Sequence, residues 1–311
     1  MKRALSAVAS KARRLALAPL GIAASLALTG CATAATLEGR PMGSDAPIVV
    51  GSQDYYSNEI LAETYAQALE AAGYAVDRQF RIGQREVYVP ELESGAIDVM
   101  PEYTGNLLQY LRPEANATRP EDVLAALVGA LPAALTALAP AEASDQDSYV
   151  VTTDFAKEHG VESIGDLAGI DDLVLGGNSE LETRPYGPKG LKNVYGVDVA
   201  FTPIEDSGGA LSLKALRSGQ VRIIDVYSSD PALASKDLTV LKDPEGMFLS
   251  SRVVPIVSSR VDAGAAEALN RVSAALDSAD LVEMNRRATQ DAAPPATIAK
   301  EWLEREGLAA K

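Results

Sequence analysis

The sequence has very little of the two residue types on which most catalytic nucleophiles and metal sites depend. Its 311 residues include one cysteine, Cys31, and one histidine, His159. A Ser-His-Asp or Cys-His arrangement would have to use His159, which stands before a glycine at an expected exposed helix end. No Gly-x-Ser-x-Gly elbow, Walker loop or nucleotide-binding glycine fingerprint occurs in the chain. We therefore expect no enzyme activity, no cofactor and no metal.

Catalysis by carboxylates alone is compatible with this shortage of histidine and cysteine. Paired carboxylates can hydrolyse glycosides without any histidine or cysteine, and the chain has 43 acidic residues. So many acids make any particular pair uninformative. A cell-envelope hydrolase that works with carboxylates therefore stays open as an alternative.

Positive charge is also scarce. The formal net charge is -15, and the first 30 residues carry five basic side chains and no acidic one, so the rest of the chain has a net charge of -20. Such an acidic protein is a poor partner for nucleic acid. An acidic surface keeps the protein soluble and favours cationic solutes.

The only long apolar run lies near the N-terminus. It covers residues 15–28, follows the basic residues and contains Pro19 and Gly21. A bilayer span needs about 20 apolar residues, so a cleaved signal peptide over residues 1–30 is the better interpretation. Residues 28–31, Leu-Thr-Gly-Cys, resemble the bacterial lipobox, in which the cysteine is acylated after cleavage.

Lipidation of Cys31 would hold the mature chain on the outer face of the cell membrane or in a periplasm. Because Cys31 is the only cysteine, the mature fold has no disulfide and must be stable through its core alone. Residues 31–46 are small, polar and turn-prone, which is typical of a flexible tether.

The pattern of apolar residues after the tether predicts two sets of alternating strands and helices. Strands at 48–51, 74–80 and 96–100 alternate with helices at 59–72 and 86–93, and a helix at 120–138 follows. A second α/β set has strands at 173–175, 199–202, 221–226 and 239–242 and helices at 189–195 and 210–217. Three helical segments, broken near Ser278 and at Pro294-Pro295, lie between 265 and 308. Strand-like crossings near 147–153 and 250–258 suggest two hinge strands. We predict an α/β protein with residues 47–150 and 253–311 in lobe 1 and 151–252 in lobe 2.

Tyrosine is the aromatic residue that stands out, with 11 copies against one tryptophan and four phenylalanines. Ligands of open α/β sheets bind beyond the carboxyl ends of strands, where four tyrosines are expected. Converging tyrosine rings can hold a cation that has no N–H to donate. We expect a binding role for Tyr55, Tyr56, Tyr103 and Tyr227. Packing explains Tyr65, Tyr74 and Tyr110, and the sequence leaves Tyr88 and Tyr186 open.

Several stretches together resemble a known family. They are residues 51–59, 83–86, 92–98 and 101–105, followed in order by 148–157, 164–167, 184–190, 195–196 and 225–230. They are similar to the substrate-binding proteins of ABC importers for glycine betaine, choline and other osmoprotectants. The Pro-Glu-Tyr-Thr-Gly stretch at 101–105 and the Tyr-Ser-x-Asp stretch at 227–230 are the most specific. The resemblance covers residues 47–305.

The resemblance implies a two-lobed type II periplasmic-binding fold that closes on its solute. It makes Tyr103 and Tyr227 walls of an aromatic cage, one from each lobe, and it gives the first-strand loop a further ring, either Tyr55 or Tyr56. Thr104 and Gly105 would turn backbone donors toward the ligand.

The chain departs from the family pattern at three places. Gln53 stands where many relatives have lysine, Gln84-Arg85 replaces glycine-threonine, and Thr202-Pro203 lies where relatives have a further tyrosine. The departures leave the ligand open. A betaine carboxylate would need donors such as Arg85 or Arg184. Choline would need only a partner for its hydroxyl, and either arginine can equally be a surface ion pair.

The sequence thus predicts a receptor and not a catalyst. It would bind a quaternary ammonium osmoprotectant, such as glycine betaine or choline, and act as a monomer. Its partners would be the membrane subunits of an ABC importer, which receive the solute, and, through them, the ATPase of the importer. The same fold serving another small solute, such as an amino acid, is the nearest alternative.

Overall fold

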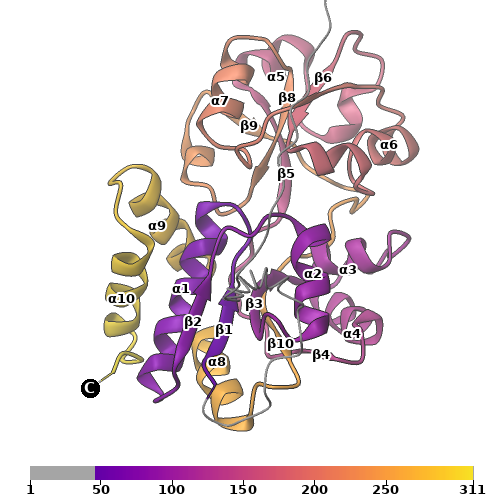
Figure 1. Ribbon diagram of the computed structural model, residues 1–311. Helices are drawn as coiled ribbons and strands as arrows, with labels where there is room; N and C mark the ends of the chain where they lie inside the picture. Colours follow the sequence, from indigo (N-terminus) through magenta and orange to yellow (C-terminus); the bar gives the residue numbers. More distant parts are fainter. Residues whose placement is uncertain (1–45, 311) are drawn as a thin grey trace, which may run out of the picture. The chain divides into compact units, whose positions relative to one another are not determined.

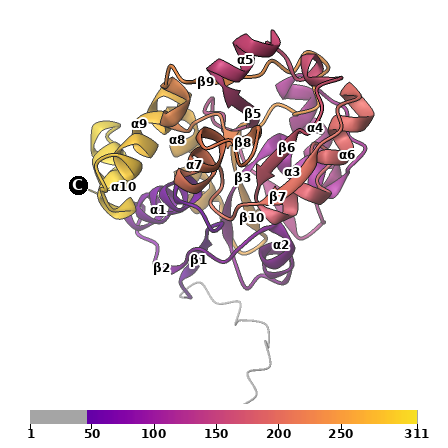
Figure 2. The same ribbon diagram turned by 90° about the horizontal axis from the view of Figure 1, so that it is seen from above.

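The computed structural model describes residues 46–310, which form two five-stranded sheets with helices packed against them (Figures 1 and 2). The predicted signal peptide, the predicted lipidation site Cys31, and all of the predicted tether except Ala46 lie outside the described residues. Within the described part, no helix is long and apolar enough to cross a membrane. The prediction of an α/β fold is confirmed.

The first sheet has the strand order β2-β1-β3-β10-β4. Strands β2, β1 and β3 are parallel because a helix returns the chain after β1 and again after β2, whereas β10 runs antiparallel between β3 and β4. The elements of this part are β1 (Ile48–Gly51), α1 (Tyr56–Ala71), β2 (Val76–Gln79), α2 (Arg85–Ser94), β3 (Val99–Tyr103), α3 (Thr104–Leu111), α4 (Pro120–Ala130), β4 (Leu135–Ala137), β10 (Val253–Ser258), α8 (Ala263–Ala275), α9 (Ser278–Thr289) and α10 (Pro295–Arg305).

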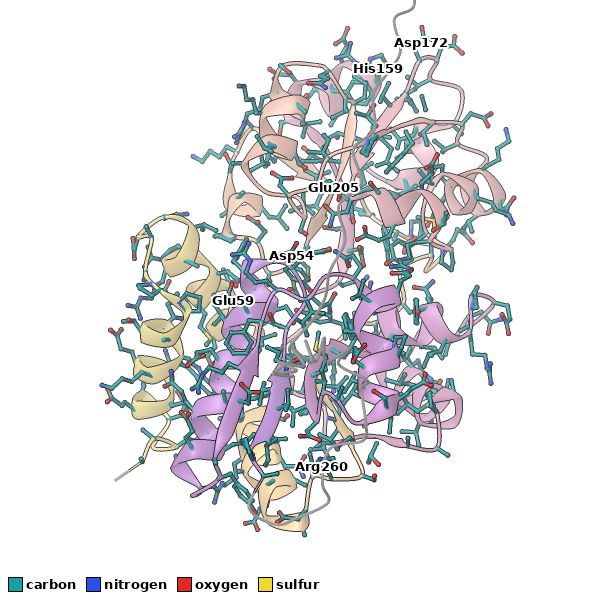
Figure 3. All side chains as sticks on the ribbon, viewed as in Figure 1. Asp54, Glu59, His159, Asp172, Glu205 and Arg260 are labelled. Atoms are coloured by element: carbon teal, nitrogen blue, oxygen red, sulfur yellow. The ribbon has the colours of Figure 1, made fainter. Side chains whose placement is uncertain are left out.

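The second sheet repeats this plan with the order β7-β6-β8-β5-β9. Strands β7, β6 and β8 are parallel, and β5 runs antiparallel between β8 and β9. The elements are β5 (Asp147–Thr152), α5 (Thr153–His159), η1 (Ile164–Leu167), β6 (Val174–Gly177), η2 (Ser179–Thr183), α6 (Pro188–Gly190), η3 (Leu191–Tyr195), β7 (Ala200–Pro203), α7 (Ala210–Arg217), β8 (Ile223–Tyr227), η4 (Pro231–Ala234) and β9 (Leu238–Val240). His159 ends α5 and is exposed, as predicted (Figure 3).

Each sheet is buried by apolar side chains on both of its faces. One face of the first sheet packs against α1 and the three C-terminal helices, through residues such as Leu61, Leu269 and Trp302. Its other face packs against α2, α3 and α4. The second sheet likewise separates two apolar clusters, one of them under α7. The predicted breaks between the C-terminal helices, near Ser278 and at Pro294-Pro295, are confirmed.

Two strands continue further than the sequence predicts. Strand β3 runs through Pro101 to Tyr103, and β8 includes Tyr227, so both tyrosines are the last residues of their strands. The reason is an antiparallel neighbour at each end, because Tyr103 lies opposite Val253 and Tyr227 lies opposite Asp147. The expected strand ends, at Met100 and Val226, were wrong by three residues and by one.

The predicted helix at 120–138 was also wrong in its second half. The helix α4 ends at Ala130, and Leu131 has the extended ψ of 141° that a residue before proline prefers. After Pro132 the chain forms β4, which adds to the edge of the first sheet beside β10.

The chain crosses between the sheets twice, between β4 and β5 and between β9 and β10. The two crossing segments form a bridge at Ser144 and Arg252. Strand β5 pairs with β8 and β9 of the second sheet, and β10 pairs with β3 and β4 of the first. The lobe boundaries at 150 and 253, and a hinge at the crossings, stay predictions.

Candidate ligand-binding site

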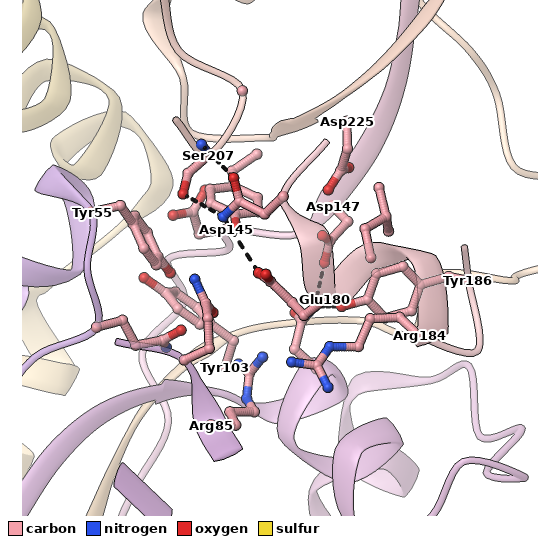
Figure 4. A pocket seen from close by; sticks show the side chains of 17 residues that line it. Tyr55, Arg85, Tyr103, Asp145, Asp147, Glu180, Arg184, Tyr186, Ser207 and Asp225 are labelled. Atoms are coloured by element: carbon pink, nitrogen blue, oxygen red, sulfur yellow. Dashed lines mark hydrogen bonds between the residues drawn. The ribbon is translucent and has the colours of Figure 1, made fainter. Parts of the chain in front are cut away.

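A pocket lies where strands of both sheets end. Its empty space, including the part open to solvent, is about 510 Å³. The first sheet contributes residues after β1, at the start of α2 and at the junction of β3 and α3. The second contributes residues at the start of β5, after β6 and at the end of β8 (Figure 4). Ligands of α/β sheets bind at such strand ends because no side chain of the sheet fills them.

Three of the four predicted tyrosines line this pocket, namely Tyr55, Tyr103 and Tyr227. The ring centroids of Tyr55 and Tyr227 are 5.1 Å apart with 49° between the ring planes, so the two rings touch although they belong to different sheets. Tyr103 is held by the amide of Asn58, whose Nδ2 donates to the Tyr103 hydroxyl at 3.3 Å. Burial raises the pKa of all three hydroxyls, which therefore stay neutral.

The fourth predicted tyrosine faces elsewhere. The hydroxyl of Tyr56 donates to Asp230 Oδ2 at 2.8 Å, and its side chain lines a separate groove beside Leu211. The side chains of Tyr55 and Tyr56 point to different places because the backbone changes conformation between them. Tyr55 stands at the N-terminal boundary of α1 in extended conformation, whereas Tyr56 is the first helical residue. Between these neighbours, Tyr55 is the residue that the structure places in the pocket.

Of the two tyrosines that the sequence leaves open, Tyr186 lines the pocket and Tyr88 does not. The Tyr186 hydroxyl accepts a hydrogen bond from Asn106 Nδ2 at 3.1 Å, which joins η2–α6 of the second part to α3 of the first. Tyr88 is fully buried and donates to Glu102 Oε1. Tyr65 is buried in the first core, as predicted.

Both predicted arginines line the pocket, and both are already paired. Arg85 binds the buried carboxylate of Glu102 through Nε at 2.9 Å and Nη2 at 2.7 Å. Arg184 binds Glu86 through Nη1 at 2.7 Å and Nη2 at 3.2 Å, and its guanidinium carbon lies 5.5 Å from the centroid of the Tyr110 ring. Because Glu86 and Tyr110 belong to α2 and α3, Arg184 links the two parts of the molecule.

Four acidic side chains also line the pocket, and the sequence alone did not single them out. They are Asp145, Asp147, Glu180 and Asp225. Asp145 accepts from Ser57 Oγ and from the backbone N–H of Ser229, both at 3.1 Å. Burial raises the pKa of Asp145 to about 6. A signal was present, since Asp145 and Asp147 flank the start of one predicted strand and Asp225 stands near the end of another.

Asp147 and Asp225 interact directly. Asp147 lies opposite Tyr227 in the register of β5 and β8, so Asp225 is its diagonal neighbour on the same face of the sheet. Asp147 accepts a hydrogen bond from Asn106 Nδ2. Burial, and next the Asp147 carboxylate, raise the pKa of Asp225 well above its ordinary range. Burial likewise raises the pKa of Glu180.

Two buried atoms of the pocket lining have no hydrogen-bond partner, namely Gln53 Nε2 and Asp225 Oδ1. Both residues are more than nine-tenths buried. A buried polar atom without a hydrogen-bond partner costs roughly 1–3 kcal/mol of stability, so such atoms are rare unless a ligand or a water molecule supplies the bond. The pocket therefore presents one unused donor and one unused acceptor to a ligand.

Thr104 and Gly105 lie beside the pocket and bond within the protein. The Thr104 N–H donates to the carbonyl of Arg252, and its hydroxyl donates to the carbonyl of Ser250. A Cβ on Gly105 would lie 2.7 Å from the carbonyl oxygen of Leu249, so glycine is needed for this close approach. The structure thus gives both residues a packing role in joining α3 to the segment before β10.

Comparison with known proteins identifies the family. The family described as OpuAC, the substrate-binding domain of ABC-type glycine betaine transport systems, matches residues 46–305. The chain belongs to this family. The resemblance predicted from the sequence motifs is therefore confirmed, and this OpuAC-type chain is a substrate-binding domain of the ABC-type glycine betaine transport family.

The relatives of the OpuAC-type chain are distant in sequence. The glycine betaine-binding protein YehZ of Escherichia coli (strain K12) is 24% identical over 284 residues, which are 86% of this chain and 93% of YehZ. The ergothioneine transport permease/ergothioneine binding protein EgtU of Helicobacter pylori (strain G27) is 25% identical over 277 residues, which are 84% of this chain and 48% of EgtU. The chain thus spans about half of EgtU.

Solved structures agree on the fold. One described as a glycine betaine/carnitine/choline ABC transporter has a TM-score of 0.66 and 21% identity, and the match covers 84% of this chain and 99% of that chain. The predicted fold class is confirmed, because the chain is a mixed α/β protein with two five-stranded sheets and its structural neighbours are two-lobed binding proteins.

Proposed function

We propose that the protein is an extracytoplasmic receptor that holds the cationic group of a quaternary ammonium solute among Tyr55, Tyr103 and Tyr227. The observation that carries the proposal is the meeting of these rings, from both sheets, in one pocket. Tyrosine faces carry negative partial charge and need no hydrogen from their guest. A desolvated ring therefore contributes roughly 0.5–2 kcal/mol to binding such a cation.

Closure of two lobes on the solute is part of the proposal. A solute that touches Tyr103 in lobe 1 and Tyr227 in lobe 2 binds the closed form more tightly than the open one and shifts the population toward it. The contacts of Asn106 with Tyr186, and of Tyr56 with Asp230, join the two sheets and support this view. We assign residues 47–150 and 253–311 to lobe 1 and residues 151–252 to lobe 2, with hinges at the crossings.

The lipid anchor completes the proposal. A monomeric receptor tethered at Cys31 stays at high effective concentration beside the membrane subunits of the importer. These subunits pass the solute inward, driven by ATP hydrolysis in the partner ATPase. Mass spectrometry of the mature protein from its host tests the anchor directly. A diacylated N-terminal Cys31 is expected, and an N-terminus at any other residue would contradict it.

Isothermal titration calorimetry with choline, glycine betaine and carnitine tests the binding proposal. At least one of these solutes should bind, and replacing both Tyr103 and Tyr227 with alanine should weaken that binding by about fivefold to a thousandfold. The matched control replaces the same tyrosines with phenylalanine, which keeps the rings. Equal affinity in the wild type and the double alanine variant would refute the cage.

A further inference from the structure

The charges of the pocket do not cancel, and their imbalance bears on which solute fits. Arg85 and Arg184 are the two basic residues of the lining, and each is engaged by a glutamate outside it. Among residues 46–310, the four acids of the lining have no cationic partner within ion-pair distance. Each buried carboxylate that remains ionised carries a desolvation cost that its present partners offset only in part.

A second observation points from these acids to a ligand. Asp225 is 8% exposed, and its Oδ1 has no hydrogen-bond partner although it lines the pocket. Its diagonal neighbour Asp147 is directed to the same region by Asn106, and Glu180 accepts a bond of 3.3 Å from Asn178 Nδ2 while the positive charge of Arg184 lies nearby without forming an ion pair with it (Figure 4). In the empty site, Asp225 Oδ1 is therefore a buried carboxyl oxygen without a partner, and further acidic side chains surround it.

We propose that Asp225, supported by Asp147 and Glu180, makes the site selective for a solute of net positive charge that donates a hydrogen bond, and makes it discriminate against zwitterionic betaines. This inference rests on the quaternary ammonium function proposed above. It separates quaternary ammonium solutes by their net charge and by whether they carry a hydrogen-bond donor. The tyrosine rings accept any quaternary ammonium group. The carboxylates require an O–H or N–H donor and oppose a second, negative group on the same solute.

The engaged arginines explain the second requirement. Charged donors bind a carboxylate about twice as strongly as neutral ones, and both guanidinium groups already hold a glutamate with two nitrogens each. Gln53 Nε2 is the one buried donor of the lining without a partner, and it is neutral. One neutral donor does not compensate for placing a carboxylate near four acids in a largely desolvated pocket.

Binding should also release a proton. Burial and Asp147 favour the protonated form of Asp225 in the empty site, where Glu180 and the N–H of Ser148 are its other polar neighbours. A cation with a donor replaces that proton, which leaves to the buffer. Calorimetry in two buffers of different ionisation enthalpy measures the number of protons released, expected to be above zero for wild type and smaller in Asp225→Asn.

Four probes separate the two properties. Choline is a cation with a hydroxyl donor, tetramethylammonium is a cation without one, carnitine is a zwitterion with a hydroxyl, and glycine betaine is a zwitterion without one. We expect choline to bind most tightly, by about tenfold or more over glycine betaine. Asp225→Asn should weaken choline by about tenfold to a hundredfold and change tetramethylammonium less, because that cation has no hydrogen bond to lose.

The matched control is Asp171→Asn, which removes the same charge from an exposed loop outside the pocket and should leave all affinities unchanged. Glycine betaine binding as tightly as choline, or an unchanged choline affinity in folded Asp225→Asn, would overturn the inference and leave the receptor function intact. If putrescine binds while no quaternary amine does, the result would support the carboxylate site and refute the tyrosine cage. Failure of all five probes would overturn both.

Discussion

The two walls of the pocket, one from each sheet, differ in whether their charged side chains are paired. The wall from the first sheet contains Arg85, whose charge is cancelled by the buried Glu102 beneath it. The wall from the second sheet contains Arg184, which is paired with Glu86 of the first part, and three acids, Asp147, Glu180 and Asp225, none of which forms an ion pair with a basic residue of the described part. A buried charge pair that is complete belongs to the structure of the protein, whereas buried charge that is incomplete is available to a ligand.

The comparison teaches that sign and burial alone do not identify a binding residue. The arginines looked suitable for a betaine carboxylate because their partners could not be seen in the sequence. In the structure, Glu102 lies on β3 and is 17 positions away from Arg85, and Glu86 is 98 positions away from Arg184. Partners this far apart in the chain are brought together only by folding.

The largest expected effect comes from removing an acid from each wall in turn. Glu102→Gln leaves Arg85 buried without a counterion and should lower the free energy of unfolding by about 3–5 kcal/mol. Asp225→Asn replaces a carboxyl group that is held protonated in the empty site with a neutral amide of similar shape, so it should leave that free energy almost unchanged. Urea denaturation of the ligand-free proteins measures both. Similar losses in the two variants would remove the distinction between the walls.

An intermediate effect is expected from pH. The pKa of Asp145 is about 6 in the empty site, and a bound cation favours its ionised form. Below pH 6, protons therefore compete with the solute, so the affinity for the solute should rise between pH 5 and 7. Asp225 should increase this rise, because its pKa is also raised. Calorimetric titrations across this range measure the slope, and an affinity that is flat in the wild type would contradict the prediction.

The ligand-free protein should respond to pH in the opposite direction. Because the pKa of Asp145 is raised from 3.8 to about 6, the folded state binds more protons than the unfolded state in that window. The contribution of Asp145 to stability is thus present at low pH and is lost as pH rises through about 6. The difference in Tm between wild type and Asp145→Asn, followed from pH 4 to 7, isolates this contribution from that of the other carboxylates.

The smallest effect is expected at the link between the walls. Glu86→Gln breaks the ion pair with Arg184, but the Glu86 side chain is 52% exposed, so the pair is worth about 1 kcal/mol at most. Choline affinity should change by less than about fivefold, with part of the loss removed at high salt. The exposed Glu93→Gln on the same helix is the control. A loss as large as that of Asp225→Asn would show that the paired arginine governs binding.

The sequence predicted the elements that local patterns determine. Strand β1 at 48–51 and helix α7 at 210–217 were predicted to the residue, because an apolar run or a helical period is complete within each. The helix at 120–138 was predicted too long, because β4 exists only through pairing with β10, about 120 residues away. The ends of β3 and β8 moved for the same reason.

For the site, sequence patterns indicated the right kind of residue and only part of the set. Strand ends and family motifs directed attention to Tyr55, Tyr103 and Tyr227, which do line the pocket, and left the choice between Tyr55 and Tyr56 open. The acids were overlooked because, among 43 acidic residues, a position near a predicted strand end does not by itself distinguish a buried acid from an exposed one.

The fold class, the family and the tyrosines could be predicted from residue patterns alone, because periodicity, turn residues and short motifs are local properties of the chain. Which charged side chains are paired and which are unpaired became visible only in the folded protein. This pairing depends on Coulomb interactions over a few ångströms and on burial, and both are set by residues such as Glu102, Asp147 and Asp225 that meet only in the folded protein.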